Sequence, residues 1–378
     1  MRERLVNRSF RLRASTVALA AALVVATALA PAAQALPGKF WGVVPQQTPS
    51  AEQFQRLKRG GVDSIRIPIP WSGVQPAKGA PLTWGGIDTL VGAASTAGIE
   101  VLPFLYGAPG WAVPVDRSIV SHPPRFLPVR TGQQRLGWQA FVQGAVLRYG
   151  PRGSFWAENP AIPPRPIRNW QIWNEPNFKY FVSRPNPAEY GKLVNLSYAA
   201  LKAADAGSKV VLGGMFARPI EATFRGPKQA YFATDFLDLM YARTPGIKGK
   251  FQGVALHPYT GEYQTLTPYI EDLRNVLVEN RDGGKGLWLT ELGWSSQPPQ
   301  PGNSFAKGKA GQKKQLQGAF RLLERNQRRW HVQRVYWFSV GDQENACNFC
   351  DGSGLFTETF VPKPSWKAFV GFAGGRAV

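Results

Sequence analysis

Short apolar runs alternate along the chain with longer segments of helical spacing. The runs lie at residues 40–43, 64–67, 101–105, 170–173, 210–212, 254–256, 287–289 and 335–338. Some of them, such as Val335-Tyr336-Trp337-Phe338, are apolar at every position, which indicates strands that are buried on both faces. Alternation of such strands with helices is typical of parallel sheets built from βαβ units.

The segments between the runs carry the apolar spacing of amphipathic helices, for example at residues 50–59, 86–97, 187–204, 267–279, 312–328 and 364–369. Eight strand–helix units in even succession predict an α/β fold, a (β/α)8 TIM barrel that forms a single domain over residues 36–378. An open doubly wound sheet is the alternative, but no G-x-G-x-x-G motif follows the first strand.

Four of the segments that follow strands are long and rich in Pro, Gly and Trp. They lie at residues 107–131, 215–230, 293–311 and 341–362. In a TIM barrel, the loops after the strands form the face that carries the active site. We therefore expect functional residues there, and we expect the Pro-rich residues 159–166, which precede a strand, on the opposite face.

The first 35 residues have the composition of a secretory signal peptide. Five arginines precede an apolar run at residues 17–30, and Ala33 and Ala35 form an A-x-A cleavage site. We predict that the mature protein begins at Leu36 and is secreted, either free or associated with the cell envelope. An uncleaved anchor is the alternative, but the run is shorter than the ~20 residues that span a bilayer, so we expect no stable membrane insertion after cleavage.

The chain is strongly basic. Loss of five basic residues and one acidic residue with the leader lowers its formal charge from +21 to +17. Such a charge favours anionic partners, which include acidic polysaccharide, a cell envelope or nucleic acid. We expect no nucleic acid partner, because the chain is predicted to be exported and lacks a basic recognition motif. The sequence carries no signal for an oligomeric state.

The only cysteines, Cys347 and Cys350, form a C-x-x-C motif. In an oxidising compartment such a pair tends to form a disulfide. A redox site is the alternative, but thioredoxin-type motifs open a helix after an early strand, whereas this one lies in a loop near the C-terminus. The chain has three histidines and no H-E-x-x-H motif, so we expect no metal and no other cofactor.

Two glutamates follow predicted strands directly. Glu175 lies in Trp173-Asn174-Glu175-Pro176-Asn177, where the proline disfavours helical geometry, and Glu291 lies in Thr290-Glu291-Leu292-Gly293-Trp294. Hydrolysis of a glycosidic bond needs one protonated carboxyl group and one ionised carboxylate. A single glutamate at a strand end is more often an ion-paired structural residue. The pair, on strands four and seven, predicts a glycoside hydrolase active site at the mouth of the barrel.

These motifs resemble clan A of the glycoside hydrolases, most closely families 39 and 5, which include xylosidase-like and cellulase-like barrels. The clan places an Asn-Glu pair after strand four and a nucleophilic Glu after strand seven. Further likeness lies at Arg66, Trp71, Gln75-Pro76 and Trp84. The resemblance implies a retaining enzyme that acts on oligo- or polysaccharide, with Glu291 as nucleophile, Glu175 as acid and base, and Asn174 bound to the substrate 2-hydroxyl.

The resemblance also suggests residues around the two glutamates. Arg66 interrupts the apolar run Ile65-Arg66-Ile67 and resembles the clan's arginine beside the nucleophile, where its charge would lower the carboxylate pKa. A structural ion pair is the alternative. His257 and Tyr259 follow strand six, where the clan often has a residue that hydrogen-bonds the nucleophile. A purely structural role is equally open for both.

Aromatic and charged residues complete the set of candidates. Trp337 matches the aromatic platform beneath the reacting sugar, while Trp71, Trp111 and Trp294 are weaker candidates, because many of the 13 tryptophans must lie in the core. Glu262, Glu344 and Asp351 are expected to be solvated loop carboxylates.

A basic strip follows Glu291 and consists of Lys307, Lys309, Lys313 and Lys314. It favours acidic glycans or an anionic envelope, unless it is only a solvated basic face. The second functional hypothesis is a secreted, non-catalytic carbohydrate-binding barrel, against which the presence of both glutamates argues. The sequence does not indicate the sugar, the linkage, or endo or exo action.

Overall fold

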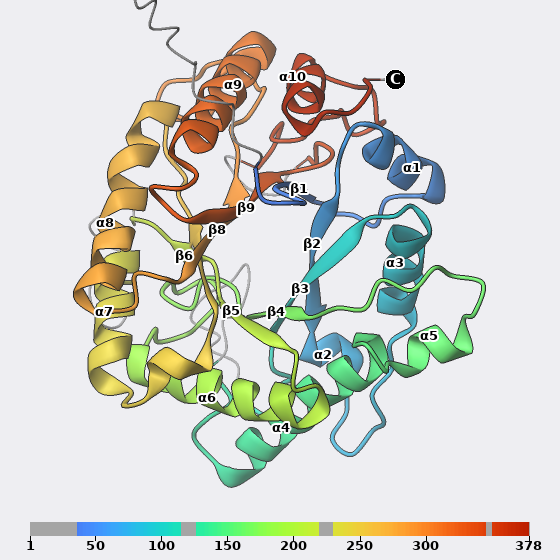
Figure 1. Cartoon of the computed structure of the whole chain (residues 1–378), viewed down its shortest axis with the longest axis vertical. Helices are drawn as coiled ribbons and strands as arrows, with labels where there is room; N and C mark the ends of the chain where they lie inside the picture. Colours follow the sequence, from blue (N-terminus) through green and yellow to red (C-terminus); the bar gives the residue numbers. More distant parts are fainter. Residues whose placement is uncertain (1–35, 115–125, 219–229, 345–349, 378) are drawn as a thin grey trace, which may run out of the picture. The chain divides into compact units, whose positions relative to one another are not determined.

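Eight parallel strands form a closed barrel in the computed structural model, which describes residues 36–114, 126–218, 230–344 and 350–377. In those residues the barrel strands are β1 (Trp41–Val44), β2 (Ser64–Pro70), β3 (Glu100–Tyr106), β4 (Asn169–Ile172), β5 (Lys209–Leu212), β7 (Gly253–His257), β8 (Gly286–Leu292) and β9 (Val332–Phe338). Their order is β5-β4-β3-β2-β1-β9-β8-β7, and Val211 of β5 pairs with Gly253 of β7 to close the ring (Figure 1). The prediction of a (β/α)8 barrel is confirmed.

The fifth barrel strand is interrupted. After Gly213 and Gly214, the two-residue strand β6 (Met215–Phe216) resumes it and pairs Phe216 with His257 of β7. A Cβ atom at Gly214 would lie 1.9 Å from His257 Nε2, so only glycine lets the histidine approach the backbone at this point. The start of the segment at residues 215–230, predicted as a loop, is therefore part of the barrel wall.

Helices surround the strands (Figure 1). In the described residues they are α1 (Ala51–Arg59), α2 (Trp71–Val74), α3 (Gly85–Thr96), α4 (Gly132–Tyr149), α5 (Ser154–Glu158), α6 (Pro187–Ala204), α7 (Ala233–Arg243), α8 (Leu266–Glu279), α9 (Gly308–Asn326) and α10 (Pro364–Ala373), with short 3-10 turns η2 (Ile247–Lys250) and η3 (Tyr263–Thr265). Several begin at residues with capping chemistry. Ser50 and Gln53 form a reciprocal capping box at α1, and Asn186 caps α6 directly before Pro187.

The apolar side chains form two layers. Inside the barrel lies a small cluster of Val44, Leu102, Val211, Ala255, Trp288, Tyr336, Phe338 and Cys350. A much larger layer fills the space between the strands and the helices. Because side chains alternate along a strand, Tyr336 and Phe338 face inward while Val335 and Trp337 face the helices. Burial on both faces explains why these strands are apolar at every position.

The predicted signal peptide at residues 1–35 lies outside the described residues, and so does Cys347, so neither cleavage nor the Cys347–Cys350 disulfide is tested. Within the described ranges, none of the helices combines the length and the apolar character that crossing a bilayer requires.

Candidate active site

The two predicted glutamates lie together at the carboxyl ends of their strands. Glu175 follows β4 and Glu291 lies in β8, and one oxygen of each, with a ring nitrogen of His257, lie within 4.8 Å of one another. Left-handed backbone at Trp173 (φ 71°) and Glu175 (φ 40°) turns the chain at the end of β4. The Glu175 amide donates to the Gly214 carbonyl at 3.1 Å, which holds this turn against the fifth strand.

Arg66 of β2 connects the strands that carry the glutamates. It is fully buried, and its three nitrogens donate to Glu291 Oε1 at 2.7 Å, to Asn174 Oδ1 at 2.6 Å and to Gln171 Oε1 at 2.6 Å. Its guanidinium also lies 4.0 Å from the centre of the Phe104 ring. Arg66 therefore lies beside Glu291, where the resemblance placed it, and it orients Asn174 as well.

His257 and Tyr259 contact different glutamates. The Tyr259 hydroxyl donates to Glu291 Oε2 at 2.8 Å, whereas His257 Nδ1 lies 2.8 Å from Glu175 Oε1 and 3.6 Å from Glu291 Oε2. The resemblance suggested that either residue binds the nucleophile. In the structure the tyrosine has that position, and the histidine binds the other glutamate.

A hydrogen-bond chain assigns the tautomer of His257. Gln171 Nε2 donates to Thr290 Oγ1 at 3.2 Å, and among the described residues His257 Nε2, at 2.9 Å, is the acceptor within reach of the Thr290 hydroxyl proton, so we infer that Thr290 donates to it. The proton of the neutral ring then resides on Nδ1 and points at Glu175. Gln171 and Thr290 were not among the predicted site residues. The sequence did carry a signal for both, because each is a polar residue within an otherwise apolar strand. Gln171 lies within β4, and Thr290 lies in β8 directly before Glu291.

Burial governs the electrostatics of the site. Burial and the nearby charge of Glu291 hold the pKa of Glu175 well above its ordinary value, while Arg66 offsets a smaller part. Burial also raises the pKa of Glu291, and Arg66 and the Tyr259 hydroxyl oppose this rise. Arg66 lowers the pKa of Glu291, as expected, but desolvation has the larger effect, so the pKa of Glu291 still lies above its ordinary value. The higher pKa belongs to Glu175, which suits a proton donor.

The expectation that Trp337 lies beneath the sugar was wrong. Its side chain is fully buried on the outer face of β9, where it packs 6.3 Å from Phe320 of α9 and donates to the Ser353 carbonyl at 3.0 Å. The adjacent Phe338 faces the barrel interior, with its ring 6.3 Å from that of Tyr259. A shift of one residue along a strand moves a side chain to the other face, and the apolar run gave no sign of which face is which.

The other tryptophan candidates also pack within the protein. Trp71 is fully buried against Phe141 of α4 and bonds Gln75, and Trp294 is buried with its indole nitrogen on the Gly261 carbonyl. Both are core residues, so their assignment to substrate binding was wrong. Trp111 is half-buried after β3, edge-on to Trp71, and remains a candidate at the rim.

Comparison with known proteins agrees with this geometry. Residues 157–363, more than half of the chain, match the profile of the family described as glycosyl hydrolase catalytic core. The chain belongs to this family. A segment of 68 residues is also 41% identical to a protein named probable glucan 1,3-beta-glucosidase A from Aspergillus niger, over 17% of this chain and 16% of that protein.

Solved structures of this glycosyl hydrolase fold include enzymes of families 39 and 5. A family 39 glycoside hydrolase from Bacteroides cellulosilyticus WH2 has a TM-score of 0.62 at 23% identity, over 89% of this chain and 64% of that one. A monomeric β-xylosidase from Caulobacter crescentus CB15 has a TM-score of 0.59 at 20% identity, over 89% and 68%. A GH5_18 protein from Bifidobacterium longum subsp. infantis has a TM-score of 0.59 at 15% identity, over 90% and 79%.

At these identities the similarity shows a shared fold. The chain spans 64% of the length of the Bacteroides protein and 16% of the Aspergillus protein. The predicted resemblance to glycoside hydrolases is confirmed by the family profile, and the resemblance to families 39 and 5 is confirmed for the fold.

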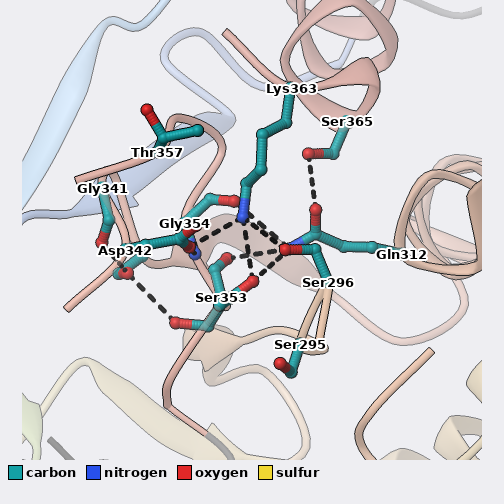
Figure 2. Close-up of polar contacts among 12 residues, drawn as sticks. Ser295, Ser296, Gln312, Gly341, Asp342, Ser353, Gly354, Thr357, Lys363 and Ser365 are labelled. Carbon is teal, nitrogen blue, oxygen red and sulfur yellow. Dashed lines mark hydrogen bonds and ion pairs between the residues drawn. The ribbon is translucent and has the colours of Figure 1, made fainter. Parts of the chain in front are cut away.

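A buried lysine organises the loops of this glycosyl hydrolase next to the site. Figure 2 shows Lys363, which precedes α10, extending its ammonium group among oxygens from separate loops. It donates to Ser296 Oγ after β8 at 2.8 Å, to Asp342 Oδ1 after β9 at 2.7 Å and to the Gly352 carbonyl at 2.9 Å. The segment from Gly352 is in turn joined to the end of β9, where the Leu355 amide donates to the Ser339 carbonyl at 3.1 Å.

The basic strip is partly neutralised. Lys307 forms an ion pair with Glu262, whose pKa is lowered chiefly by that hydrogen bond. Glu262 is exposed, as expected of a solvated loop carboxylate, and it also pairs with Lys307. Lys309, Lys313 and Lys314 are exposed, as is Glu344. Asp351 accepts a hydrogen bond from Ser295 through its backbone carbonyl.

Proposed function

We propose that this chain is a retaining glycoside hydrolase with Glu291 as nucleophile and Glu175 as acid and base. The observation that carries the proposal is the approach of the two carboxyl groups within 4.8 Å in unequal environments. Retaining enzymes hold these groups about 5–5.5 Å apart, whereas inverting enzymes leave about 6.5–9.5 Å for a water molecule. Unequal pKa values assign the proton to Glu175 and the charge to Glu291.

In the first step, a carboxylate oxygen of Glu291 bonds to the anomeric carbon while the bond to the leaving oxygen breaks. Glu175 transfers its proton to that oxygen, so the leaving group departs as a neutral alcohol. In the second step, Glu175 takes a proton from water, the water oxygen bonds to the anomeric carbon, and Glu291 is released. In the tautomer inferred above, His257 Nδ1, which lies 2.8 Å from Oε1 of Glu175, donates to that oxygen and stabilises the carboxylate between the steps.

Asn174 contributes to sugar recognition in this proposal. Arg66 Nη2 binds its side-chain oxygen at 2.6 Å, and this contact orients the amide. The amide nitrogen is then directed elsewhere and supplies two donors for the 2-hydroxyl of the sugar. Phe338 takes the place proposed for Trp337 as the inward-facing ring, because it lies beside Tyr259 on the mouth side of β9.

We propose β-linked glucose or xylose glycans as the first substrates to test, because the relatives named above act on such sugars by their names. The test is a hydrolysis screen over β-glucans, xylans, mannans and their oligosaccharides, with the product anomer followed by NMR. Retention with wild-type protein, and loss of turnover in a folded Glu291→Gln variant, support the proposal. Initial release of the inverted anomer contradicts it. Glycan binding with no turnover on any substrate would favour a non-catalytic carbohydrate-binding barrel.

Azide separates the two glutamate roles. Glu175→Ala removes the acid and base, so substrates with poor leaving groups slow most, and external azide restores turnover by attacking the glycosyl-enzyme without base assistance. Recovery of a β-glycosyl azide supports the assignment. Equal loss on all leaving groups, with no effect of azide, would assign Glu175 another role.

We also propose that residues 1–35 direct export and that Cys347 and Cys350 form a disulfide in the exported protein. The composition of the leader and the C-x-x-C spacing support these proposals. Mass spectrometry of protein from the culture medium and the cell envelope tests both. We expect an N-terminus at Leu36, and a mass increase of two hydrogens on reduction.

A further inference from the structure

Aromatic rings form a continuous row from the nucleophile to the protein surface. The Tyr259 ring, whose hydroxyl binds Glu291, lies 6.2 Å from the Phe216 ring. Phe216 stacks on Phe178 at 5.3 Å, and Phe178 contacts Tyr180 at 4.9 Å. The four rings come from the loop after β7, from β6, and from the loop after β4. The row therefore follows the rim of the barrel between Glu291 and the segment that follows Glu175.

The outer end of the row is open to solvent. Tyr180 is 40% exposed, and it is the one aromatic residue among the large exposed hydrophobic side chains of the described residues. Phe216 is half-buried. Its side chain faces the barrel mouth, because it lies two residues after Gly214, whose Cβ position points at His257 and Thr290. Tyr259 and Phe178 are buried and Phe216 packs against the core, so these rings form a rigid base that presents the exposed Tyr180 ring at the surface.

Hydrogen bonds hold the row in place. Asn177 is fully buried, and its side chain binds β6 from both ends of the amide: Nδ2 donates to the Phe216 carbonyl at 2.8 Å, and Oδ1 accepts from the Phe216 amide at 3.0 Å. The same Nδ2 donates to the Tyr231 carbonyl at 2.9 Å. The loop that carries Phe178 and Tyr180 is thus joined to the fifth strand, so the rings are positioned before any ligand arrives.

The row lies on the leaving-group side of the proposed reaction. The general acid, Glu175 in this proposal, must lie beside the oxygen that departs. The chain continues from Glu175 directly into the row, and the Phe178 amide donates to the Glu175 carbonyl at 3.0 Å. The exposed face of a tyrosine matches the apolar C–H face of a pyranose ring, and tyrosine adds a hydroxyl for a polar contact. The flat ring face and the hydroxyl therefore favour a sugar as the leaving group over a charged group or a flexible alkyl chain.

We propose that Tyr180, supported by Phe178 and Phe216, binds a sugar unit on the leaving-group side, so that oligosaccharides of two or more units are the preferred substrates. This inference rests on the proposed function. It assigns Tyr180 a role in substrate selection that is separate from the chemistry at Glu175 and Glu291.

Kinetics with two substrates of the same sugar separate leaving-group binding from chemistry. A glycosyl fluoride forms the glycosyl-enzyme without a sugar as leaving group, whereas a trisaccharide places sugar there. The pair is β-D-xylosyl fluoride with xylotriose, β-D-glucosyl fluoride with laminaritriose, or β-D-mannosyl fluoride with mannotriose, whichever sugar the screen selects. We expect Tyr180→Ala to lower kcat/KM on the trisaccharide about tenfold and to leave the fluoride within about twofold of wild type.

Two variants serve as controls. Tyr180→Phe keeps the ring and retains most of the trisaccharide activity, whereas Tyr198→Ala removes a half-exposed tyrosine from the outer helix α6 and changes neither substrate. Equal losses on the fluoride and the trisaccharide, or no loss on either, in Tyr180→Ala would overturn the inference alone. Absence of any hydrolysis by the wild-type protein would overturn the proposed function and this inference with it.

Discussion

At the scale of single residues, the charged groups of the site form hydrogen bonds to side chains that are in turn fixed by further hydrogen bonds. Arg66 donates hydrogen bonds to Glu291, Asn174 and Gln171. Gln171 in turn donates to Thr290, whose hydroxyl contacts His257. Arg66 and Gln171 therefore each donate to acceptors in fixed directions, which is the condition under which buried polar groups do not destabilise a core. The same contacts distribute the charge unequally between the two glutamates.

Tyr259→Phe tests the charge on Glu291, the proposed nucleophile. The tyrosine hydroxyl stabilises ionised Glu291 and so lowers its pKa, against the larger effect of burial. Its removal raises that pKa, and we expect the acidic limb of the kcat/KM profile to shift to higher pH. On that limb, activity falls about 10- to 100-fold, because a hydrogen bond to a charged group contributes about 1.5–3 kcal/mol. Tyr198→Phe on α6 is the matched control, and an unmoved acidic limb would contradict the assignment.

Glu175→Gln tests, through the pH dependence of stability, whether Glu175, the proposed acid, holds a proton in the folded protein. Because burial and Glu291 raise the pKa of Glu175 in the folded protein, the native state keeps a proton that the unfolded chain loses above its own pKa of about 4.3. The free energy of unfolding of the wild-type protein therefore falls as pH rises from the pKa of Glu175 in the unfolded chain to its higher pKa in the folded protein. Glutamine carries no such proton, so the variant gains stability relative to wild type as pH rises. Urea unfolding at a series of pH values measures the difference, and a constant difference would refute the shift.

At the scale of elements, the catalytic face depends on loops that are joined to one another by buried polar groups. Lys363 binds the loops after β8 and β9 (Figure 2), and the segment from Gly352 is joined to the end of β9 by the hydrogen bond from the Leu355 amide to the Ser339 carbonyl. Burial lowers the pKa of Lys363, and Asp342 counteracts part of that effect. Gly214 also shapes the catalytic face, because the absence of a side chain at this position in the fifth strand leaves room for the His257 ring.

Lys363→Met tests the contribution of the lysine to these loops. The change leaves Asp342 without its buried partner, and we expect a loss of about 3–5 kcal/mol in the free energy of unfolding, measured with urea. The double variant Lys363→Met/Asp342→Asn removes the uncompensated charge and keeps an acceptor for the Gly354 amide, which now binds Asp342 at 2.9 Å. It should recover part of the loss. If both variants unfold like wild type, the lysine does not support the loops.

At the scale of the whole molecule, closure of the barrel brings β2, β4, β7 and β8 to one mouth. Closure occurs through the pairing of β5 with β7, and the interrupted fifth strand leaves Phe216 and Gly214 facing that mouth. The net charge of the chain acts over the same scale. Lys307 is paired with Glu262, whereas Lys309, Lys313 and Lys314, in the helix that follows β8, are exposed and contribute positive charge.

Salt dependence tests whether this field selects acidic glycans. Attraction between exposed charges is screened over about 10 Å at 0.1 M ionic strength, so added salt should raise KM for a uronic-acid-containing xylan more than for an unsubstituted one. The triple variant Lys309→Gln/Lys313→Gln/Lys314→Gln should remove that difference without affecting the neutral substrate. Identical salt dependence for both glycans would mean that the strip is only a solvated basic face.

The sequence by itself determined the barrel and the two glutamates. Eight short, mainly apolar runs that alternate with helical segments predict a closed parallel barrel, and a polar residue directly after a buried strand lies at the carboxyl end of the sheet. The tertiary structure decided which contacts those residues make. An apolar run does not indicate which of its residues face inward, so Phe338 rather than Trp337 lines the mouth. The partition of His257 and Tyr259 between the two glutamates, and the aromatic row to Tyr180, arise from residues that only barrel closure brings together.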